Sequence, residues 1–425
     1  MKVFKFGGAS VSTAERIQHV RSILEQYKQE QLLIVISAMG KTTNALEQVV
    51  EAFFAGRKDD ALQLFAEIKH AHLQVRQQLM DEQHVDPVSL NDFFTEAEWL
   101  LHDHPVRDYD YYYDQIVCLG ELLSTAIVSN YFNHCGIPNV WIDVRDIIRT
   151  DDNFRDAIID WDYTSAKVNE EIKPLLEQKK IVLTQGFIGA TAANESTTLG
   201  REGSDYTAAV FANLLDAESQ TIWKDVQGVM NADPKHYKAA TFISKLNYRE
   251  VIEMAYYGAQ VIHPKTIKPL ENKNIPLFVR SFIDPQEPGT CIHNKNTEHL
   301  PPIIVYKYNQ VLVQLNSKDF SFVGEGLTAR LYEMFETLKF KPNLTQNAAI
   351  SLMVVVDEHP EKVDQLAHAA SEAFGVTIQR ALTLLTIRHY NQNLLDELCR
   401  DCEIILKQQT PETIQVLMKK ADNEN

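Results

Sequence analysis

The feature that most constrains the fold is a nearly continuous apolar run, Leu32–Ala38, which leads into a polar loop and a helical pattern. A strand that is apolar on both faces belongs in a sheet covered on both faces, as parallel sheets are. The same plan of strand, polar loop and helix recurs at Lys2–Phe6, Ile181–Gln185 and Thr221–Trp223. The sequence therefore predicts an α/β fold with a doubly covered, mainly parallel sheet.

The order of elements changes after a linker at Asn294–Pro302. Beyond it, the order strand, helix, strand, strand, helix, strand is that of a ferredoxin-like α+β unit. A second, shorter round ends at the strand Thr413–Met418, without a closing helix and strand. We therefore predict two domains, residues 1–293 and 294–425, and the second of these ends in a truncated unit.

Composition narrows the class of partner. The net charge of -17 argues against nucleic acid or an anionic membrane surface as the main partner. No apolar run reaches the roughly 18 residues of a membrane span, and the N-terminus lacks a signal-peptide layout. Of the five cysteines, only Cys399 and Cys402 form a C-x-x-C, and no second pair completes a zinc site. We expect a cytoplasmic protein without a protein-held metal.

The first strand ends in features that favour anion binding. Gly7 and Gly8 follow it directly, and glycines let backbone N–H groups approach an anion without a Cβ in the way. Lys5 lies within the strand, where a buried lysine is costly unless it faces an anion. The spacing matches neither the P-loop nor the dinucleotide fingerprint, so neither applies.

A second candidate anion site lies in Thr198–Ala209. Two glycines flank Arg201, and Ser204 and Asp205 stand where a helix begins. Helix N-termini attract anions, and the arginine fork matches a carboxylate or a phosphate. The alternative is an ordinary capped helix with a surface arginine, and this segment alone does not decide between the two.

Glu121 is the most unusual acid of the sequence. It stands in an otherwise apolar helical stretch among Leu119, Leu122 and Leu123. A carboxylate in such a place normally needs a partner. It is either an exposed residue of the helix or an inward acceptor, and the leucines favour the inward acceptor.

Five segments, in order along the chain, carry a resemblance to a known family: K-F-G-G-A-S-V at 5–11, S-A-M-G with T-T-N at 37–44, G-E at 120–121, T-L-G-R with G-S-D at 198–205, and W-K-D-V-Q-G at 223–228. They resemble the aspartate kinases of the amino-acid kinase superfamily. The likeness runs from the first residue to about Thr290, and the tail resembles the tandem ACT regulatory region of that family.

The resemblance implies transfer of the γ-phosphoryl group of ATP, with Mg²⁺, to the side-chain carboxylate of L-aspartate, a step toward lysine, threonine and methionine. It also implies an amino-acid effector at the ACT region and a homodimer or higher homo-oligomer. The nucleophile has an ordinary pKa of about 3.9, so it needs no general base. Catalysis then consists of positioning and positive charge.

The resemblance also assigns roles to residues. Lys5 would neutralise the transferring phosphoryl group and Asp205 would organise that lysine. The substrate-binding residues would be Thr43, Glu121, Arg201 and Ser204, with Arg201 on the α-carboxylate and Glu121 on the ammonium group. The nucleotide-binding residues would be Lys5, Gly7, Gly8, Ser10, Lys224, Asp225, Met230, Lys235 and Gln260. Mg²⁺ would be held mainly by the phosphates.

Three positions depart from the family pattern. Gln260 stands where many relatives have a lysine, Glu202 replaces a glycine beside Arg201, and Met230 replaces an aromatic residue. Two alternatives therefore stay open. One is a kinase of another acid, such as glutamate or an N-acetylated amino acid, although an acetylated amine has no charge for Glu121. The other is a catalytically weak amino-acid sensor on the same scaffold.

Overall fold

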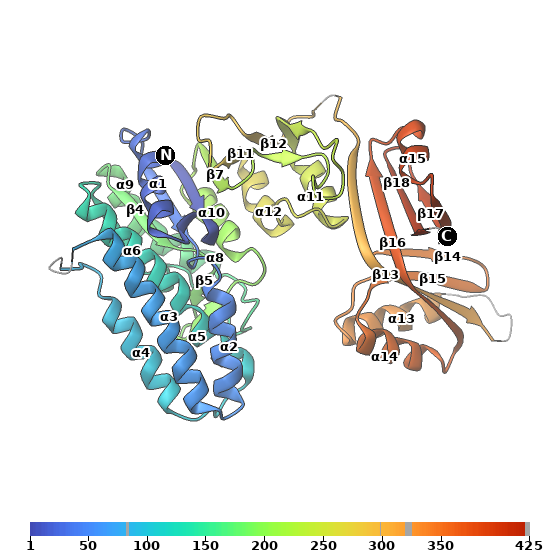
Figure 1. Ribbon diagram of the computed structural model, residues 1–425, viewed down its shortest axis with the longest axis horizontal. Helices are drawn as coiled ribbons and strands as arrows, with labels where there is room; N and C mark the ends of the chain where they lie inside the picture. The colour runs from blue at the N-terminus through green and yellow to red at the C-terminus, as the bar shows by residue number, and fades with distance from the viewer. Residues whose placement is uncertain (82–84, 298, 319–324, 421–425) are drawn as a thin grey trace. The chain divides into compact units, whose positions relative to one another are not determined.

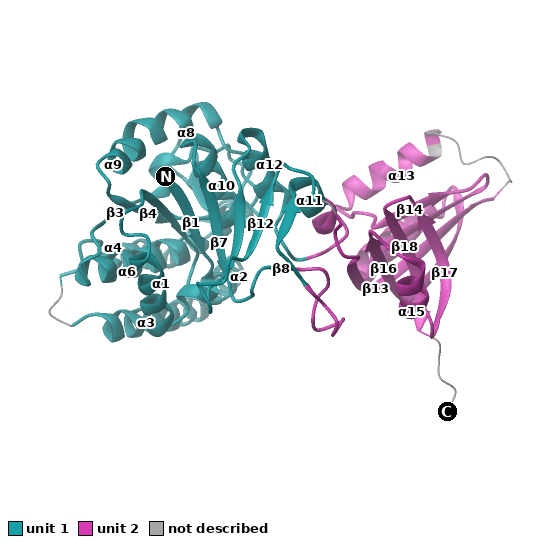
Figure 2. Ribbon diagram, turned by 90° about the horizontal axis from the view of Figure 1, so that it is seen from above, with its two compact units in different colours: residues 1–229, 242–252, 260–297 teal, residues 230–241, 253–259, 298–425 magenta. Residues whose placement is uncertain are grey.

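The structure is a computed structural model that describes residues 1–81, 85–297, 299–318 and 325–420 (Figure 1). It divides into two compact units. Unit 1 comprises residues 1–229, 242–252 and 260–297, and unit 2 comprises residues 230–241, 253–259 and 298–425 (Figure 2). Two short segments that precede the predicted domain boundary thus belong to unit 2.

Unit 1 contains an eight-stranded sheet in the order β10-β12-β11-β7-β1-β2-β4-β3. Neighbouring strands are parallel except for β11 and β12, which are antiparallel. The strands are β1 (Lys2–Phe6), β2 (Leu32–Ile36), β3 (Asn139–Ile142), β4 (Ile181–Gln185), β7 (Ser219–Lys224), β10 (Lys245–Asn247), β11 (Leu277–Ser281) and β12 (Thr290–His293). The predicted mainly parallel sheet is confirmed.

Helices cover both faces of this sheet. Helices α1, α2, α3, α4 and α6 lie on one side and α8, α9, α10 and α12 on the other (Figure 2). The helices of residues 1–297 are α1 (Ala14–Glu25), α2 (Thr42–Phe54), α3 (Lys58–Leu79), α4 (Leu90–His102), α5 (Tyr109–Val117), α6 (Leu119–His134), α7 (Val144–Ile147), α8 (Trp161–Lys167), α9 (Lys173–Glu177), α10 (Gly203–Leu214), α11 (Tyr248–Tyr256) and α12 (Pro264–Lys273), with the short η1 (Gly8–Val11) and η2 (Val168–Ile172).

The central strands of the sheet bring the loops at their carboxyl ends to one edge. β1 pairs in parallel with β2 on one side and with β7 on the other. Every residue of β2 is buried, as its apolar sequence predicts. Because the strands are parallel, their carboxyl ends meet at one edge, where open α/β sheets bind ligands. Two short strand pairs lie in sequence between strands of the main sheet: β5 (Ile188–Ala190) with β6 (Ser196–Thr198) between β4 and β7, and β8 (Val229–Met230) with β9 (Phe242–Ile243) between β7 and β10.

Unit 2 is built on a six-stranded antiparallel sheet in the order β14-β15-β13-β16-β18-β17. Two strands of 15 residues each, β13 and β16, run through both halves of the sheet. The elements are β13 (Ile303–Ser317), α13 (Glu325–Thr337), β14 (Leu344–Asn347), β15 (Ser351–Asp357), α14 (Pro360–Ala370), β16 (Phe374–Arg388), α15 (Gln392–Leu398), β17 (Cys402–Gln409) and β18 (Thr413–Lys420).

The second half of this sheet has a closing strand that the sequence did not predict. The first residues of β13, Ile303–Lys307, pair with Leu384–Arg388 of β16. The strand position that seemed to be missing at the C-terminus is therefore filled by a segment that precedes the first half. Both halves then have the strand arrangement of a ferredoxin-like unit, and the predicted α+β fold is confirmed.

Three apolar clusters hold unit 2 together. Helices α13 and α14 pack on a cluster around Val313 and Val354, and α15 packs on another around Leu385 and Val416. Side chains that alternate with these along the strands form a third cluster that draws on both halves: Leu312, Leu344, Val355, Leu382, Leu384, Leu406 and Leu417. The two halves therefore share one interior layer. Residues 230–241 contribute to the α15 cluster through Ala232 and Tyr237.

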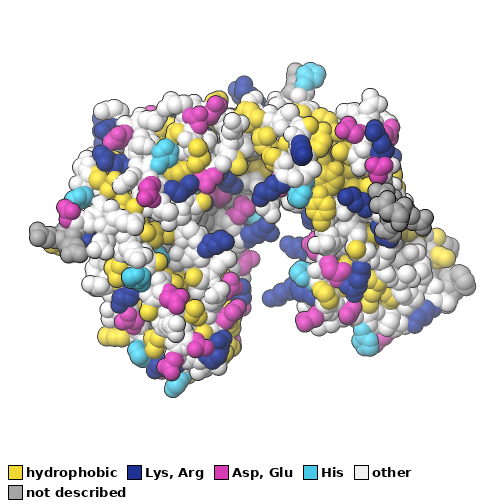
Figure 3. Space-filling view, viewed as in Figure 1, with side chains coloured by type: hydrophobic (Ala, Val, Ile, Leu, Met, Phe, Trp, Pro, Cys, Tyr) yellow, Lys and Arg dark blue, Asp and Glu magenta, His cyan; other side chains and the backbone are white. Residues whose placement is uncertain are grey.

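The surface in Figure 3 carries Lys and Arg side chains interspersed with Asp and Glu. Among the described residues, none of the helices combines the length and the apolar character needed to cross a bilayer. All five cysteines are free thiols.

Candidate active site

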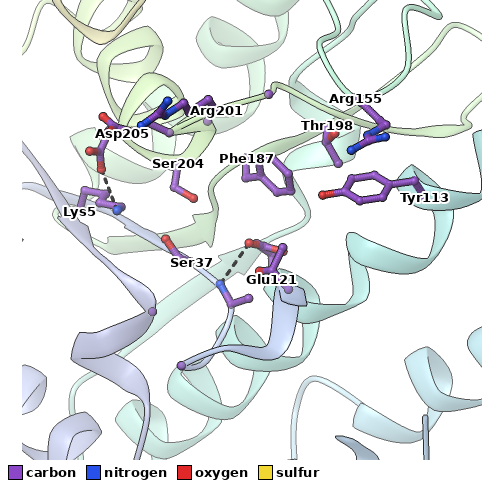
Figure 4. Close-up of a pocket in the computed structure, with 17 residues that line it drawn as sticks. Lys5, Ser37, Tyr113, Glu121, Arg155, Phe187, Thr198, Arg201, Ser204 and Asp205 are labelled. Atoms are coloured by element: carbon purple, nitrogen blue, oxygen red, sulfur yellow. Dashed lines mark hydrogen bonds and ion pairs between the residues drawn. The ribbon is translucent and has the colours of Figure 1, made fainter. Parts of the chain in front are cut away.

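A cavity of about 460 Å³ lies in unit 1 (Figure 4). Its walls come from the end of β1, the loops after β1, β2 and β4, the loop between α7 and α8, the segment from β6 into α10, and helices α2, α5 and α6. Predicted residues that line it are Lys5, Gly8, Thr43, Glu121, Arg201, Ser204 and Asp205. The segments that carry them are far apart in sequence, and the fold brings them together in one cavity.

Lys5 and Asp205 form an ion pair on one wall of the cavity. The Lys5 Nζ lies 2.7 Å from Asp205 Oδ1, and the two side chains are 12% and 5% exposed. Asp205 lies in the first turn of α10, where the helix dipole favours negative charge. The ion pair gives the lysine of the central strand β1 the partner that its burial demands, and it orients the ammonium group at the edge of the cavity (Figure 4).

Gly8 allows the turn after β1 to lie against the loop after β2. A Cβ at this position would come within 2.5 Å of the Ala38 carbonyl oxygen. The Gly8 carbonyl accepts a hydrogen bond from Gly40 N–H at 2.9 Å. Any other residue would push the two loops apart, so Gly8 is required by close packing.

Glu121 projects from the first turn of α6 and is buried, as the flanking leucines predict, with 3% of its surface exposed. Its Oε1 accepts a hydrogen bond from Ala38 N–H at 3.2 Å, whereas Oε2 has no hydrogen-bond partner in the described part of the chain. Burial raises the pKa of this carboxyl to about 8, against the opposing effects of the Ala38 N–H and the Lys5 charge. A buried acid with an unpartnered oxygen at a cavity wall is suited to a cationic ligand group.

The start of α10 with its preceding loop, and the start of α2, supply the remaining predicted substrate residues. Ser204 is buried at the start of α10, and Arg201 lies exposed on the preceding loop (Figure 4). Thr43 faces the cavity from the start of α2. The helix N-terminus and the Arg201 guanidinium together offer hydrogen-bond donors and positive charge to an anionic ligand.

Sequence reasoning missed a third wall of the cavity, formed by Tyr113, Arg155, Phe187 and Thr198. The Arg155 guanidinium lies 4.3 Å from the centre of the Tyr113 ring. No motif marks Tyr113, Arg155 or Phe187, which come from α5 and from two loops outside the family segments. Thr198 ends β6 and begins the T-L-G-R segment, but sequence reasoning assigned it no role.

Buried Asp114 holds this third wall in place. Its carboxylate accepts hydrogen bonds from the backbone N–H of Thr198 at 2.8 Å, from the Thr198 hydroxyl at 2.7 Å and from Arg155 N–H at 3.0 Å. Burial raises the pKa of Asp114 to about 6, although these three donors oppose the shift. An acid among tyrosines on a predicted helix was the only signal available.

The other predicted nucleotide residues lie outside the cavity lining. Gly7 and Ser10 belong to the turn after β1. Lys224 ends β7, beside β1, and donates a hydrogen bond to the Val261 carbonyl at 2.7 Å, while Asp225 pairs with Arg16. Gln260 is exposed in unit 1, and Met230 and Lys235 belong to unit 2. Their role in nucleotide binding stays a prediction.

Comparison with known proteins shows to which family the chain belongs. Residues 1–281 match the model of the amino acid kinase family. A chloroplastic aspartokinase 1 of Arabidopsis thaliana is 32% identical over 401 residues, which cover 89% of this chain and 68% of that protein. The lysine-sensitive aspartokinase 3 of Escherichia coli is 31% identical over 359 residues, covering 84% and 78%. The chain belongs to the aspartokinases of the amino acid kinase family.

The likeness to aspartokinases extends through both units. The crystal structure of E. coli aspartokinase III in complex with aspartate and ADP has a TM-score of 0.82 and 26% identity, and covers 98% of this chain and 96% of its own. The chain also matches a bifunctional aspartokinase/homoserine dehydrogenase of Zea mays, of which it spans 32% of the length.

Proposed function

We propose that this aspartokinase transfers the γ-phosphoryl group of ATP to the side-chain carboxylate of L-aspartate and forms 4-phospho-L-aspartate and ADP. The observation that supports this most strongly is the composition of one cavity. It combines a cationic strand end, at Lys5, with a buried acid, Glu121, whose second oxygen has no partner. An amino acid with an anionic side chain fits both residues, because its side chain can face Lys5 while its ammonium group faces Glu121.

The proposed pose of aspartate follows from the charges. The α-ammonium group lies at Glu121 and supplies the hydrogen bonds that Oε2 lacks. The α-carboxylate receives the Arg201 fork, and Thr43 and Ser204 donate to its remaining oxygens. The side-chain carboxylate then points toward Lys5. Each charge-assisted hydrogen bond contributes about 1.5–3 kcal/mol, so the pose is strongly preferred over its reverse.

The reaction needs no proton transfer. An oxygen of the ionised side-chain carboxylate forms a bond to the γ-phosphorus, and the bond from that phosphorus to the bridging oxygen of ADP breaks. Lys5 neutralises charge on the transferring group, while Asp205 keeps the ammonium in place. Backbone N–H groups of Gly7 and Gly8 provide further donors to the phosphoryl oxygens.

The nucleotide is proposed to bind beside the carboxyl ends of β1 and β7, where Gly7, Gly8, Ser10, Lys224 and Asp225 gather. Met230, Lys235 and Gln260 complete the proposed set. Mg²⁺ would be held mainly by the phosphates of the nucleotide, whose charge it would neutralise.

We further propose that residues 1–293 form the catalytic domain and residues 294–425 a tandem ACT regulatory region that binds an amino-acid effector. The name of the E. coli relative, a lysine-sensitive aspartokinase, makes lysine the first effector to test. A homodimer or higher homo-oligomer and a cytoplasmic location complete the proposal.

A coupled assay of ADP formation tests the proposed activity. The full-length protein is supplied with MgATP and, in turn, L-aspartate, L-glutamate and N-acetyl-L-glutamate. We expect turnover with L-aspartate and little with the other two, because glutamate is one methylene longer and the acetylated amine carries no charge for Glu121. Faster turnover with another acid would mean that this acid, and not L-aspartate, is the substrate. No turnover with any of the three acids would favour the amino-acid sensor.

A further inference from the structure

The segment that carries Arg201 has an unusual backbone. Gly200 has a φ of 74° and Glu202 a φ of 54°, both in the left-handed region. Glycine takes this conformation freely, but a residue with a Cβ is strained there by roughly 1–2 kcal/mol. A glutamate at such a position persists when its side chain makes contacts that offset the strain.

The Glu202 side chain makes such a contact. Its Oε2 accepts a hydrogen bond from the backbone N–H of His263 at 2.8 Å. His263 is the residue that caps the N-terminus of α12. The carboxylate therefore lies where unpaired N–H groups and the helix dipole favour a negative charge. Glu202 ties the loop before α10 to the start of α12, sixty-one positions further along the chain.

Lys265, in the first turn of α12, makes a second connection to the same loop. Its Nζ donates to the Leu199 carbonyl at 3.0 Å and lies 2.8 Å from Asp156 Oδ1. Asp156 is 72% exposed, so its ion pair contributes little, and the hydrogen bond to the backbone carbonyl is the stronger restraint. Gly200 lets Asp156 approach, since a Cβ there would lie 2.6 Å from the same Oδ1.

We propose that Glu202 and Lys265 act as positioning residues that fix Arg201 from both sides and so set the affinity for the acidic substrate. Arg201 lies between Leu199 and Glu202, and each of these two residues is bound to the first turn or the cap of α12. Without the two contacts, the exposed arginine is free to sample positions from which it cannot reach the substrate carboxylate. The inference rests on the proposed function, which assigns Arg201 to the α-carboxylate of aspartate.

The test uses the full-length protein and steady-state kinetics with L-aspartate. We expect Glu202→Gly to raise the Michaelis constant for aspartate about 3- to 10-fold, as the loss of one hydrogen bond allows, with kcat and the Michaelis constant for ATP within about 2-fold. Glycine also relieves the left-handed strain, so the melting temperature should stay equal or rise. Glu202→Gln keeps an oxygen acceptor for His263 N–H and should restore part of the affinity.

Lys265→Met should raise the same Michaelis constant by a similar factor. Lys268→Met is the matched control, because Lys268 is an exposed lysine one turn further along α12 that makes neither of these contacts. Hydrogen exchange of the amides at 199–203 gives a readout that does not depend on turnover. We expect faster exchange in Glu202→Gly and Lys265→Met and unchanged exchange in Lys268→Met.

An unchanged Michaelis constant for aspartate in Glu202→Gly would overturn the proposal, whatever the exchange shows. An equal effect of Lys268→Met would also overturn it. If the wild-type protein does not phosphorylate aspartate, the proposed function fails, and exchange alone then decides: faster exchange supports the contacts as restraints on the loop, and unchanged exchange refutes them.

Discussion

The two sides of the cavity solve the problem of buried charge in different ways. On the side of β1 and α10, Lys5 and Asp205 are within 2.7 Å and compensate each other. On the side of α6, Glu121 has one backbone donor and an oxygen without a partner in the described residues. The charges of the first side are paired within the protein, whereas the second has an acceptor left over. In the proposed function, the reacting end of the substrate therefore lies at the first side and its ammonium group lies at the second.

The largest expected effect comes from the compensated side. Lys5→Met removes the charge proposed to stabilise the transferring phosphoryl group and should lower kcat about 100- to 1000-fold. Because it also leaves Asp205 buried without its partner, Lys5→Met combined with Asp205→Asn is the matched control for folding, checked by thermal melting. A kcat within a factor of three of the wild type in Lys5→Met would remove Lys5 from the catalytic role.

The next effect comes from the uncompensated side and separates binding from stability. Glu121→Gln should raise the Michaelis constant for aspartate about 10- to 150-fold, the equivalent of one charge-assisted hydrogen bond. Since the amide is easier to bury than a carboxylate, the melting temperature at pH 8 should rise by a few degrees. Tighter aspartate binding by the variant, measured by calorimetry, would contradict the assignment of the ammonium group to Glu121.

The raised pKa of Glu121 sharpens the comparison through pH. Burial raises this pKa from 4.5 to about 8, so the free protein below pH 8 holds a proton that an ammonium group must displace. The apparent Michaelis constant for aspartate should therefore fall by up to about tenfold per pH unit between pH 6 and 8, then level off. Glu121→Gln should abolish this slope, and calorimetry in buffers of different ionisation enthalpy should detect proton release in the wild type.

The same pKa shift predicts how stability depends on pH. The folded protein binds the Glu121 proton more tightly than the unfolded chain does, because its pKa is raised. The contribution of this group to stability is therefore greatest below pH 4.5 and declines as the pH rises to about 8. The difference in melting temperature between Glu121→Gln and the wild type should widen over that range, and a constant difference would contradict it.

The smallest effect on activity is expected from a residue that lies on neither side of the cavity. Gln260 is exposed and lies outside the cavity lining. Gln260→Lys should therefore leave kcat and the Michaelis constant for aspartate within about 2-fold, and should lower that for ATP modestly if position 260 faces the nucleotide phosphates. A collapse of activity would show that this segment binds differently from the prediction, and Gln260→Met controls for the change of length without charge.

Much of the fold and of the cavity could be predicted because short-range patterns determine them. The apolar sequence of β2 and the glycines after β1 indicate a parallel sheet and the edge at which it binds ligands. Leucines around Glu121 predict its burial, which is confirmed. Lys5 and Asp205, 200 positions apart, were paired only through the family resemblance.

What could not be predicted depends on contacts distant in sequence. Asp114, Arg155 and Thr198 form one hydrogen-bonded wall, but none belongs to a pattern that reveals the other two. Glu202 was recognised only as a departure from the family, and its bond to His263 N–H depends on how α12 approaches the loop. The closing strand of the second half of unit 2 is formed by residues 303–307, which precede the first half in the sequence.

The most direct test of the central claim is a crystal structure of the full-length protein with L-aspartate and ADP. We expect the aspartate ammonium within hydrogen-bond distance of Glu121, the α-carboxylate on Arg201, and the side-chain carboxylate directed at Lys5. Aspartate bound with its ammonium away from Glu121, or with its side-chain carboxylate directed away from Lys5, would contradict this pose.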